Sequence, residues 1–162
     1  MIEVDEVGTT FDENAILKAV GYAKQSGLLT LADDSGLEVD VLGGRPGVLS
    51  ARYGGDISFA QRMELLLDEL GESADHRYAR FVCSIALATP DGTVVARESG
   101  FCNGKIAFRP KGNNGFGYDP IFIPDGYETT FGELDDVIKA SFSHRTAAFR
   151  KIIPKLRGFI AH

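Results

Sequence analysis

Two stretches rich in β-forming residues, separated by only four residues, constrain the fold of this chain more than any other feature. They are YARFVCSIALAT (78–89) and VVARESGFCNGKIAF (94–108), and Pro90-Asp91-Gly92-Thr93 stands between them. Proline presets a turn-compatible φ, aspartate bonds to the nearby backbone, and glycine tolerates positive φ. The pattern therefore predicts two strands joined by a turn.

Helix signals precede these strands. TTFDENAILKAVGYAKQSG (9–27) carries Thr10 and Glu13 at the spacing of a capping box, and Gly27 stands where a C-terminal stop belongs. FAQRMELLLDELG (59–71) has the periodicity of an amphipathic helix. Two helices are therefore expected before the strands at 78–89 and 94–108.

Further elements complete the expected order. LLTLAD (28–33) predicts a short buried strand that ends at an acidic pair, and another strand is expected near 120–123. Ser143 can cap a last helix, HRTAAFRKIIPKL (144–156), in which Pro154 should kink or end the regular part. Strands mixed with helices predict an α/β or α+β fold with a mixed sheet, and the lack of repeats or linkers predicts one domain over residues 1–162.

Composition narrows the class of protein. Glycine makes up 19 of 162 residues, about 12% against a usual value of roughly 7%, which indicates shaped loops. The net charge of −6 argues against a general nucleic-acid binder, because duplex affinity depends on Lys and Arg. No apolar stretch approaches the ~20 residues of a membrane span, so a cytoplasmic protein is expected. Cys83 and Cys102 lack metal-ligand spacing, and buried free thiols are favoured over a disulfide.

The acidic pair in ADDSG (32–36) is the first candidate for chemistry. Adjacent carboxylates at the end of a strand point to opposite sides, so one can face a cleft while the other supports the loop. Mg²⁺ usually takes one or two protein carboxylates together with substrate phosphates. Glu6 is a candidate second ligand. The alternative interpretation is a solvated acidic turn and an exposed Glu6.

A glycine-rich loop, GNNGFGYDP (112–120), is the second candidate. Gly and Asn permit positive φ and close backbone approach to a ligand, and the ring of Phe116 can stack on a base. The alternative is that Phe116 and Tyr118 fill the core. Cationic side chains that a triphosphate would need stand elsewhere in the chain, although each one is individually compatible with an ordinary surface position: Lys18, Lys111, Lys139, His144 and Arg145.

Four motifs in order, TFDENAILKA, LADDSGLEVDVLGGRPGVLSARYGG, GNNGFGYDPIF and SHRTAA, closely resemble the inosine/xanthosine triphosphate pyrophosphatase (Ham1-like) family. The resemblance runs from about Glu6 to the C-terminus. It implies an α/β fold with a long central twisted mixed sheet, flanking helices, a cleft between two lobes and a homodimer. It also implies Mg²⁺-dependent hydrolysis of deaminated purine nucleoside triphosphates (ITP, dITP, XTP) to the monophosphate and pyrophosphate.

The resemblance assigns roles residue by residue. Asp34 would activate the attacking water and share Mg²⁺ with Glu6, and Lys18 would bind the phosphates. His144 and Arg145 as donors would suit the 6-oxo group of hypoxanthine or xanthine, whereas in adenine they would face an amino group, which is itself a donor. The substrate-binding residues implied by the motifs are Ser35, Phe116, Gly117, Tyr118, Asp119, Lys139, His144 and Arg145.

One departure from the family pattern concerns the N-terminus. Family members open with a strand and a phosphate-gripping T/S-x-N-x-x-K loop, whereas this chain starts at MIEVDEVGTTF and contains no such segment. The expectation is an N-terminally truncated form, natural or engineered, with an altered sheet or an enlarged homodimer contact. A catalytically weak or inactive homologue that binds nucleotide or acts through dimerisation is the alternative, and a pyrophosphatase of the septum-formation inhibitor type is a third interpretation.

Overall fold

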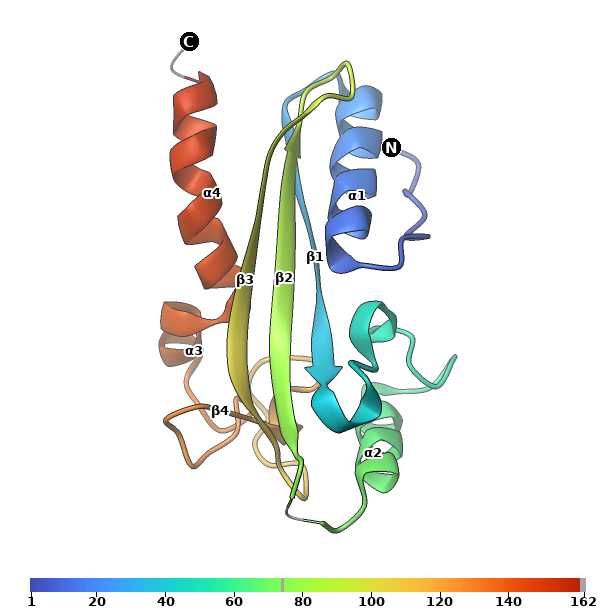
Figure 1. Ribbon diagram of the computed structural model, residues 1–162, viewed down its shortest axis with the longest axis vertical. Coiled ribbons are helices and arrows are strands. Elements are labelled where there is room, and N and C mark those ends of the chain that lie inside the picture. The colour runs from blue at the N-terminus through green and yellow to red at the C-terminus, as the bar shows by residue number, and fades with distance from the viewer. Residues whose placement is uncertain (74, 161–162) are drawn as a thin grey trace. The chain divides into compact units, whose positions relative to one another are not determined.

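The computed structural model describes residues 1–73 and 75–160, which contain four α-helices, four strands and three short 3-10 helices (Figure 1). In chain order the α-helices and strands are α1 (Phe11–Ser26), β1 (Thr30–Val39), α2 (Phe59–Leu70), β2 (Tyr78–Ala88), β3 (Val94–Ile106), β4 (Phe122–Pro124), α3 (Asp136–Phe142) and α4 (His144–Ile160).

The strands form one sheet in the order β1-β2-β3-β4. The expected turn joins β2 to β3, with the N–H of Gly92 donating to the carbonyl of Thr89 at 2.8 Å. A mixed sheet was expected, but β1, β2 and β3 alternate in direction, and β4 pairs antiparallel with β3 (Figure 1). The described strands are antiparallel because each one pairs with its neighbour in the sequence and the chain reverses between them.

One expected strand boundary needs correction. β1 does not end at the acidic pair but continues to Val39, because Leu37 and Val39 extend the alternating burial into a second core. Of the two alternatives for Pro154, an end of the helix is excluded, because Pro154 lies inside α4. The sequence analysis did not anticipate α3.

Local signals for the first two helices are confirmed. In α1, the N–H of Glu13 donates to the Thr10 hydroxyl and the Glu13 carboxylate accepts from the Thr10 N–H, which completes the capping box. Gly27 ends the helix at φ 69°, a conformation that glycine adopts without steric cost. Ser58 and Gln61 form the same box before α2.

The chain divides into two compact units. Unit 1 consists of Met1–Ser35, Val82–Phe101 and the segment that starts at His144, and unit 2 consists of Gly36–Phe81 and Cys102–Ser143. Each unit has its own hydrophobic core.

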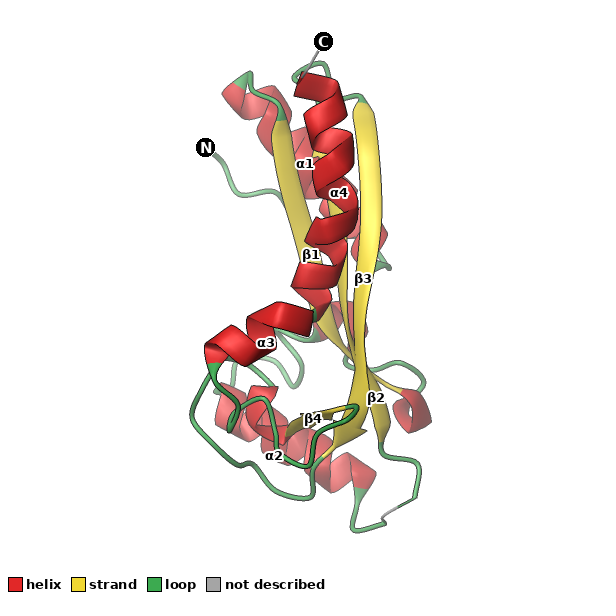
Figure 2. Ribbon diagram, turned by 90° about the vertical axis from the view of Figure 1, so that its left-hand side faces the viewer, coloured by secondary structure: helices red, strands yellow, loops and turns green. Residues whose placement is uncertain are grey.

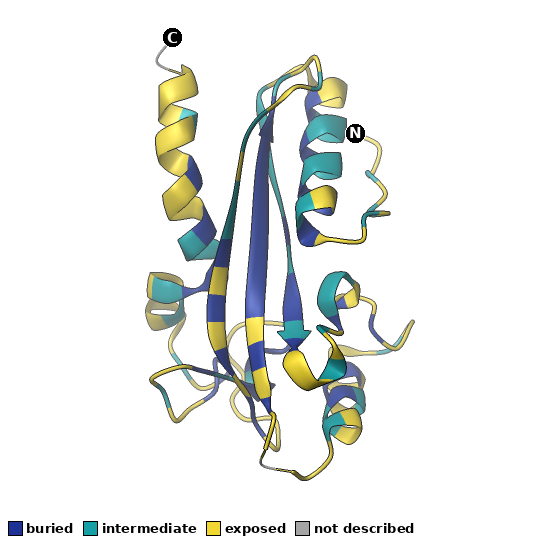
Figure 3. Cartoon of the chain, in the orientation of Figure 1, coloured by how far each residue is buried: buried dark blue, intermediate teal, exposed yellow. Residues whose placement is uncertain are grey.

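Unit 1 is built in layers, with α1 and α4 on opposite faces of the sheet (Figure 2). Successive residues of a strand point to opposite faces. In β2, Ala86 and Ala88 accordingly pack against Ala15, Ala19 and Ala23 of α1, while Cys83 and Ile85 pack against Ala148 and Ile152 of α4. This part of β2 is therefore buried on both sides, and it is the dark centre of the sheet in Figure 3.

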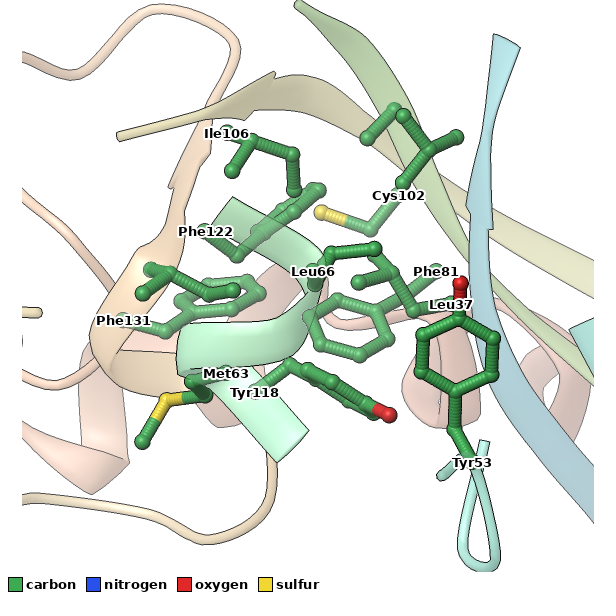
Figure 4. Close-up of a cluster of buried hydrophobic side chains, with 13 residues drawn as sticks. Leu37, Tyr53, Met63, Leu66, Phe81, Cys102, Ile106, Tyr118, Phe122 and Phe131 are labelled. Carbon is green, nitrogen blue, oxygen red and sulfur yellow. The ribbon is translucent and has the colours of Figure 1, made fainter. Parts of the chain in front are cut away.

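Unit 2 has an aromatic core (Figure 4). The ring of Phe122 lies 4.6 Å from that of Phe81 and 5.3 Å from that of Phe131, measured between centroids. Leu66 of α2 and Leu37 of β1 are fully buried in the same cluster. This core anchors the segments on either side of the glycine-rich loop.

In the part of the chain that the structure describes, no helix combines the length and apolar character that crossing a membrane requires.

Candidate functional site

The carboxylate of Asp34 lies at the centre of a polar cluster in unit 1. Asp34 is 8% exposed and projects from β1 toward α1. Its Oδ2 accepts a hydrogen bond from the side-chain amide of Asn14 at 3.1 Å, and its Oδ1 accepts from the Lys18 ammonium at 3.2 Å. Asn14 and Lys18 stand one helical turn apart, so both reach the same point on the strand.

The N-terminal segment joins this cluster through Glu6 and Gly8. The Lys18 ammonium donates to Glu6 Oε1 at 2.5 Å, and the N–H of Gly8 donates to Asn14 Oδ1 at 2.8 Å. A Cβ at Gly8 would lie 2.6 Å from that Oδ1, so the approach of backbone to amide requires glycine. The fully buried Asn14 thus bridges the N-terminal segment and β1.

The cluster shifts two protonation equilibria. Burial raises the pKa of Asp34 above its ordinary value, against the opposing effects of the Lys18 charge and the Asn14 hydrogen bond. Burial acts to lower the pKa of Lys18, but the hydrogen bond to Glu6 and the charge of Asp34 outweigh it, so the pKa of Lys18 is raised. Asp34 is therefore a stronger base than an exposed aspartate, beside an ammonium that stays charged.

The side chain of Asp33 lies on the opposite face of β1 from that of Asp34, as predicted for adjacent residues of a strand. Its Oδ2 accepts from the Nε of Arg145 at 3.3 Å and from the hydroxyl of Ser35 at 3.0 Å. The thiol of Cys83 also points to this oxygen, at 3.8 Å, and burial raises the pKa of that thiol to about 11, so it stays protonated. Asp33 thereby holds the side chain of Arg145.

His144 and Arg145 begin α4, where the helix approaches β3 closely. A Cβ at Gly100 would lie 2.2 Å from the carbonyl oxygen of His144 and 2.3 Å from the backbone nitrogen of Ala148. Glycine at this position therefore permits the contact that sets the start of α4. His144 is 5% exposed, whereas 41% of the Arg145 side chain is exposed.

In unit 2, the glycine-rich loop is shaped around the buried carboxylate of Asp119. Its Oδ2 accepts from the N–H of Phe116 at 2.9 Å and forms an ion pair with the Lys139 ammonium of α3. Gly115 has φ 70°, and a Cβ there would lie 1.9 Å from Asp119 Oδ2. Gly112 has φ 79°, and a Cβ there would lie 1.9 Å from the carbonyl oxygen of Gly132. The loop has this form only with glycine at both positions.

The two aromatic residues of the loop differ in their exposure to solvent. Phe116 is 64% exposed, and the Lys139 ammonium lies 4.8 Å from its ring centroid. Tyr118 is 3% exposed, donates its hydroxyl to the carbonyl of Ser50 at 2.9 Å and packs edge-on against Phe59. The structure thus makes Tyr118 a core residue of unit 2 and leaves Phe116 exposed. Gly117, between them, has φ 62°.

The structure brings Glu6, Lys18 and Asp34 into one cluster, with Ser35 and Arg145 grouped around the adjacent Asp33. It brings Phe116, Asp119 and Lys139 into another. The first group belongs to unit 1 and the second to unit 2.

The sequence analysis missed Asn14 and gave Asp33 no definite role. A usable signal for Asn14 was its position four residues before Lys18, which places the two side chains on one helix face.

Comparison with known proteins identifies the family. A model of the Ham1 family matches residues 1–155. A dITP/XTP pyrophosphatase from Nostoc sp. is 46% identical over 160 residues, which cover 99% of this chain and 80% of that protein. A dITP/XTP pyrophosphatase from Rhodospirillum centenum is 51% identical over 156 residues, which cover 94% of this chain and 76% of that protein.

Solved structures agree with these relatives. The Ham1 protein from Staphylococcus aureus matches with a TM-score of 0.90 and 42% identity, over 98% of this chain and 82% of that one. A HAM1 protein from Coxiella burnetii matches with a TM-score of 0.89 and 41% identity, over 97% of this chain and 81% of that one. Because the family model matches residues 1–155 of this 162-residue chain, the chain belongs to the Ham1 family.

Proposed function

We propose that this chain hydrolyses deaminated purine nucleoside triphosphates such as ITP, dITP and XTP to the monophosphate and pyrophosphate. The observation that carries the proposal is the buried Asp34, held by Asn14 and Lys18 and raised in pKa. The dITP/XTP pyrophosphatase activity named for relatives at 46% and 51% identity supports the same reaction.

Asp34 acts as the general base. Its carboxylate accepts a proton from water while the water oxygen bonds to the α-phosphorus; the bond from that phosphorus to the bridging oxygen breaks, and pyrophosphate leaves. A raised pKa makes this carboxylate a better proton acceptor near neutral pH than an exposed aspartate. Lys18, positively charged and between two carboxylates, balances the charge of the phosphate chain.

The donor set fits Mg²⁺. Among the described residues no group of three or more His, Cys, Asp or Glu side chains gathers around one point, but Mg²⁺ commonly takes one or two carboxylates and completes its shell with substrate phosphates and water. Glu6 and Asp34, both within reach of the Lys18 ammonium, would hold the ion. When bound, the metal would neutralise phosphate charge.

Phe116 provides the platform for the purine. Its ring is 64% exposed on a loop fixed by Asp119, and stacking of a base on an aromatic ring contributes about 1–3 kcal/mol. His144 and Arg145, at the start of α4, would supply the donors for the 6-oxo group of hypoxanthine or xanthine, and Lys139 is assigned to the base as well, as the resemblance of the motifs implies. Adenine has an amino donor there, and an unpaired buried donor costs about 1–3 kcal/mol. Ser35 is assigned to the substrate as well, with Gly117, Tyr118 and Asp119 shaping the base pocket.

Two finer proposals accompany the reaction, a homodimer and a cytoplasmic location. The resemblance of the motifs to the family supports the homodimer, and the lack of an apolar stretch near the ~20 residues of a membrane span in the sequence supports the location. Sedimentation equilibrium of the purified chain tests the first, and a single sedimenting species of about 17.5 kDa would contradict it.

The deciding experiment measures pyrophosphate release from ITP with Mg²⁺, beside ATP and GTP, for the wild-type chain, Asp34→Asn and Asp12→Asn. Asp12 lies on α1 in an exposed ion pair with Arg97, so its substitution should leave turnover unchanged. Selective ITP turnover that only Asp34→Asn abolishes supports the proposal. Folded wild-type protein with no turnover above the Asp34→Asn background contradicts it and favours an inactive homologue that binds nucleotide.

A further inference from the structure

A basic cavity of about 490 Å³ lies in unit 2, and none of the residues that line it has a role in the hydrolysis proposed above. Its cationic lining comes from Arg77, Lys105, Arg109 and Lys111, and the ring of Phe108 lies among them. The volume falls in the range of small-molecule sites. Such a concentration of positive charge is notable in a chain with a net charge of −6.

Three of these cations are uncommitted. Within residues 1–73 and 75–160, the side chains of Lys105, Arg109 and Lys111 form no ion pair and donate no hydrogen bond. Seven other cationic side chains of this part are paired with carboxylates: Lys18, Arg45, Arg80, Arg97, Lys139, Arg145 and Lys155. All three are exposed at the cavity. An anion that enters meets cations without first breaking an internal ion pair.

Arg77 adds a fixed positive charge. It is 6% exposed, and its guanidinium donates to the carbonyls of Ile106 at 2.8 Å, Ala107 at 3.0 Å and Gly71 at 2.9 Å. These three acceptors are neutral, and the charge of Glu72, which does not line the cavity, offsets part of the guanidinium charge. Burial lowers the pKa of Arg77, although a guanidinium stays protonated at neutral pH.

Two acidic residues also line the cavity. Glu133 accepts hydrogen bonds from the N–H of Thr130 at 2.9 Å and from its hydroxyl at 3.3 Å, which directs part of its charge toward that turn. Glu128 is exposed. Four cations and these two carboxylates give the lining a positive net charge. Three cations without an internal partner suit a ligand whose negative charge is spread over several atoms better than they suit a ligand with a single carboxylate.

Phe108 gives the cavity an aromatic wall. Its ring is 49% exposed, and the Arg77 guanidinium lies 4.3 Å from its centroid. An aromatic ring beside fixed and mobile cations is the combination that binds phosphorylated aromatic ligands in single-stranded nucleic-acid sites.

We propose that this cavity binds a phosphate-chain anion at a second site, held by Lys105, Arg109 and Lys111 over the Phe108–Arg77 pair. The source is either an inorganic chain or the triphosphate of a nucleotide. Neither Asp34 nor Phe116 lines the cavity, so this proposal is independent of the hydrolysis proposed above.

Tripolyphosphate and ATP, each added to ¹⁵N-labelled protein in EDTA at low salt, test the site. The backbone amide signals of residues 105–109 and 111 should shift with both, in a titration separable from any shift near Asp34. Affinity should fall at least tenfold in the Lys105→Glu/Arg109→Glu variant. The Lys24→Glu/Arg157→Glu variant makes the same change in net charge at exposed residues away from the cavity, and its affinity should stay within about twofold of wild type.

Equal affinities for the two probes identify an inorganic chain as sufficient, and at least tenfold tighter binding of ATP identifies a nucleotide. The site is refuted if neither probe shifts the backbone amide signals of residues 105–109 and 111, or if the two charge-reversal variants lose affinity equally. Failure of ITP hydrolysis would affect neither result.

Discussion

Replacing Asn14 with alanine tests how the Asp34 cluster is held together. The substitution removes the hydrogen bond to Asp34 and the one from the N–H of Gly8. A hydrogen bond to a charged group contributes about 1.5–3 kcal/mol and a neutral one about 0.5–1.5 kcal/mol. Since Asn14 is fully buried and water does not simply replace it, the free energy of unfolding should fall by about 2–4.5 kcal/mol.

The same substitution should raise the pKa of Asp34 further. The Asn14 amide stabilises the ionised carboxylate and so opposes the effect of burial. Without that donor the protonated form gains, and the acid limb of any activity profile moves to higher pH. A purely structural role for Asn14 would lower stability and leave this protonation equilibrium unchanged.

Urea denaturation gives the change in stability, and a ¹³C NMR titration of the Asp34 carboxyl group gives the change in pKa. Asn14→Leu fills the vacated space while still removing both bonds, which separates lost volume from lost hydrogen bonds. Asn103→Ala is the matched control, because Asn103 is exposed and should change stability by no more than about 0.5 kcal/mol. A loss as small as that of the control, or an Asp34 pKa that stays put or falls in Asn14→Ala, would refute the reasoning.

Three further predictions concern both units. Phe116→Ala should raise the KM for ITP by about 5- to 150-fold through lost stacking, with an unchanged urea midpoint because the ring is 64% exposed; an unchanged KM would exclude Phe116 as the base platform. The folded pKa of Asp34 lies above the ordinary value of 3.8, so its protonation stabilises the fold at low pH, and this contribution is lost as pH rises through the folded pKa. The free energy of unfolding of wild type relative to Asp34→Asn, measured by urea denaturation, should therefore decrease with pH across that window. A difference that increases with pH would contradict the shift. Gly112→Ala should lower the free energy of unfolding more than Gly126→Ala does. Both glycines have positive φ, but only a Cβ at residue 112 would lie against the carbonyl of Gly132. Equal losses of unfolding free energy would show that the loop relaxes.

Short-range chemistry explains what the sequence predicted well. The Thr10–Glu13 capping box and the stop at Gly27 need only neighbours within one turn, so the ends of α1 follow from the residues themselves. The turn between β2 and β3 is equally local. Alternation along a strand also sent Asp33 and Asp34 to opposite faces, even though β1 runs on past them.

Contacts distant in the sequence decided the rest. Asn14 matters because α1 packs on β1 and buries it against Asp34, twenty residues away. The sequence left open whether Phe116 or Tyr118 fills the core, and only the hydroxyl of Tyr118 meets a buried acceptor, the carbonyl of Ser50. The basic cavity gathers Arg77 with residues near 105–111 that no spacing connects. Local sequence therefore determines where elements begin, end and turn, while burial in the tertiary structure determines which polar groups find partners and which side chains stay exposed for a ligand.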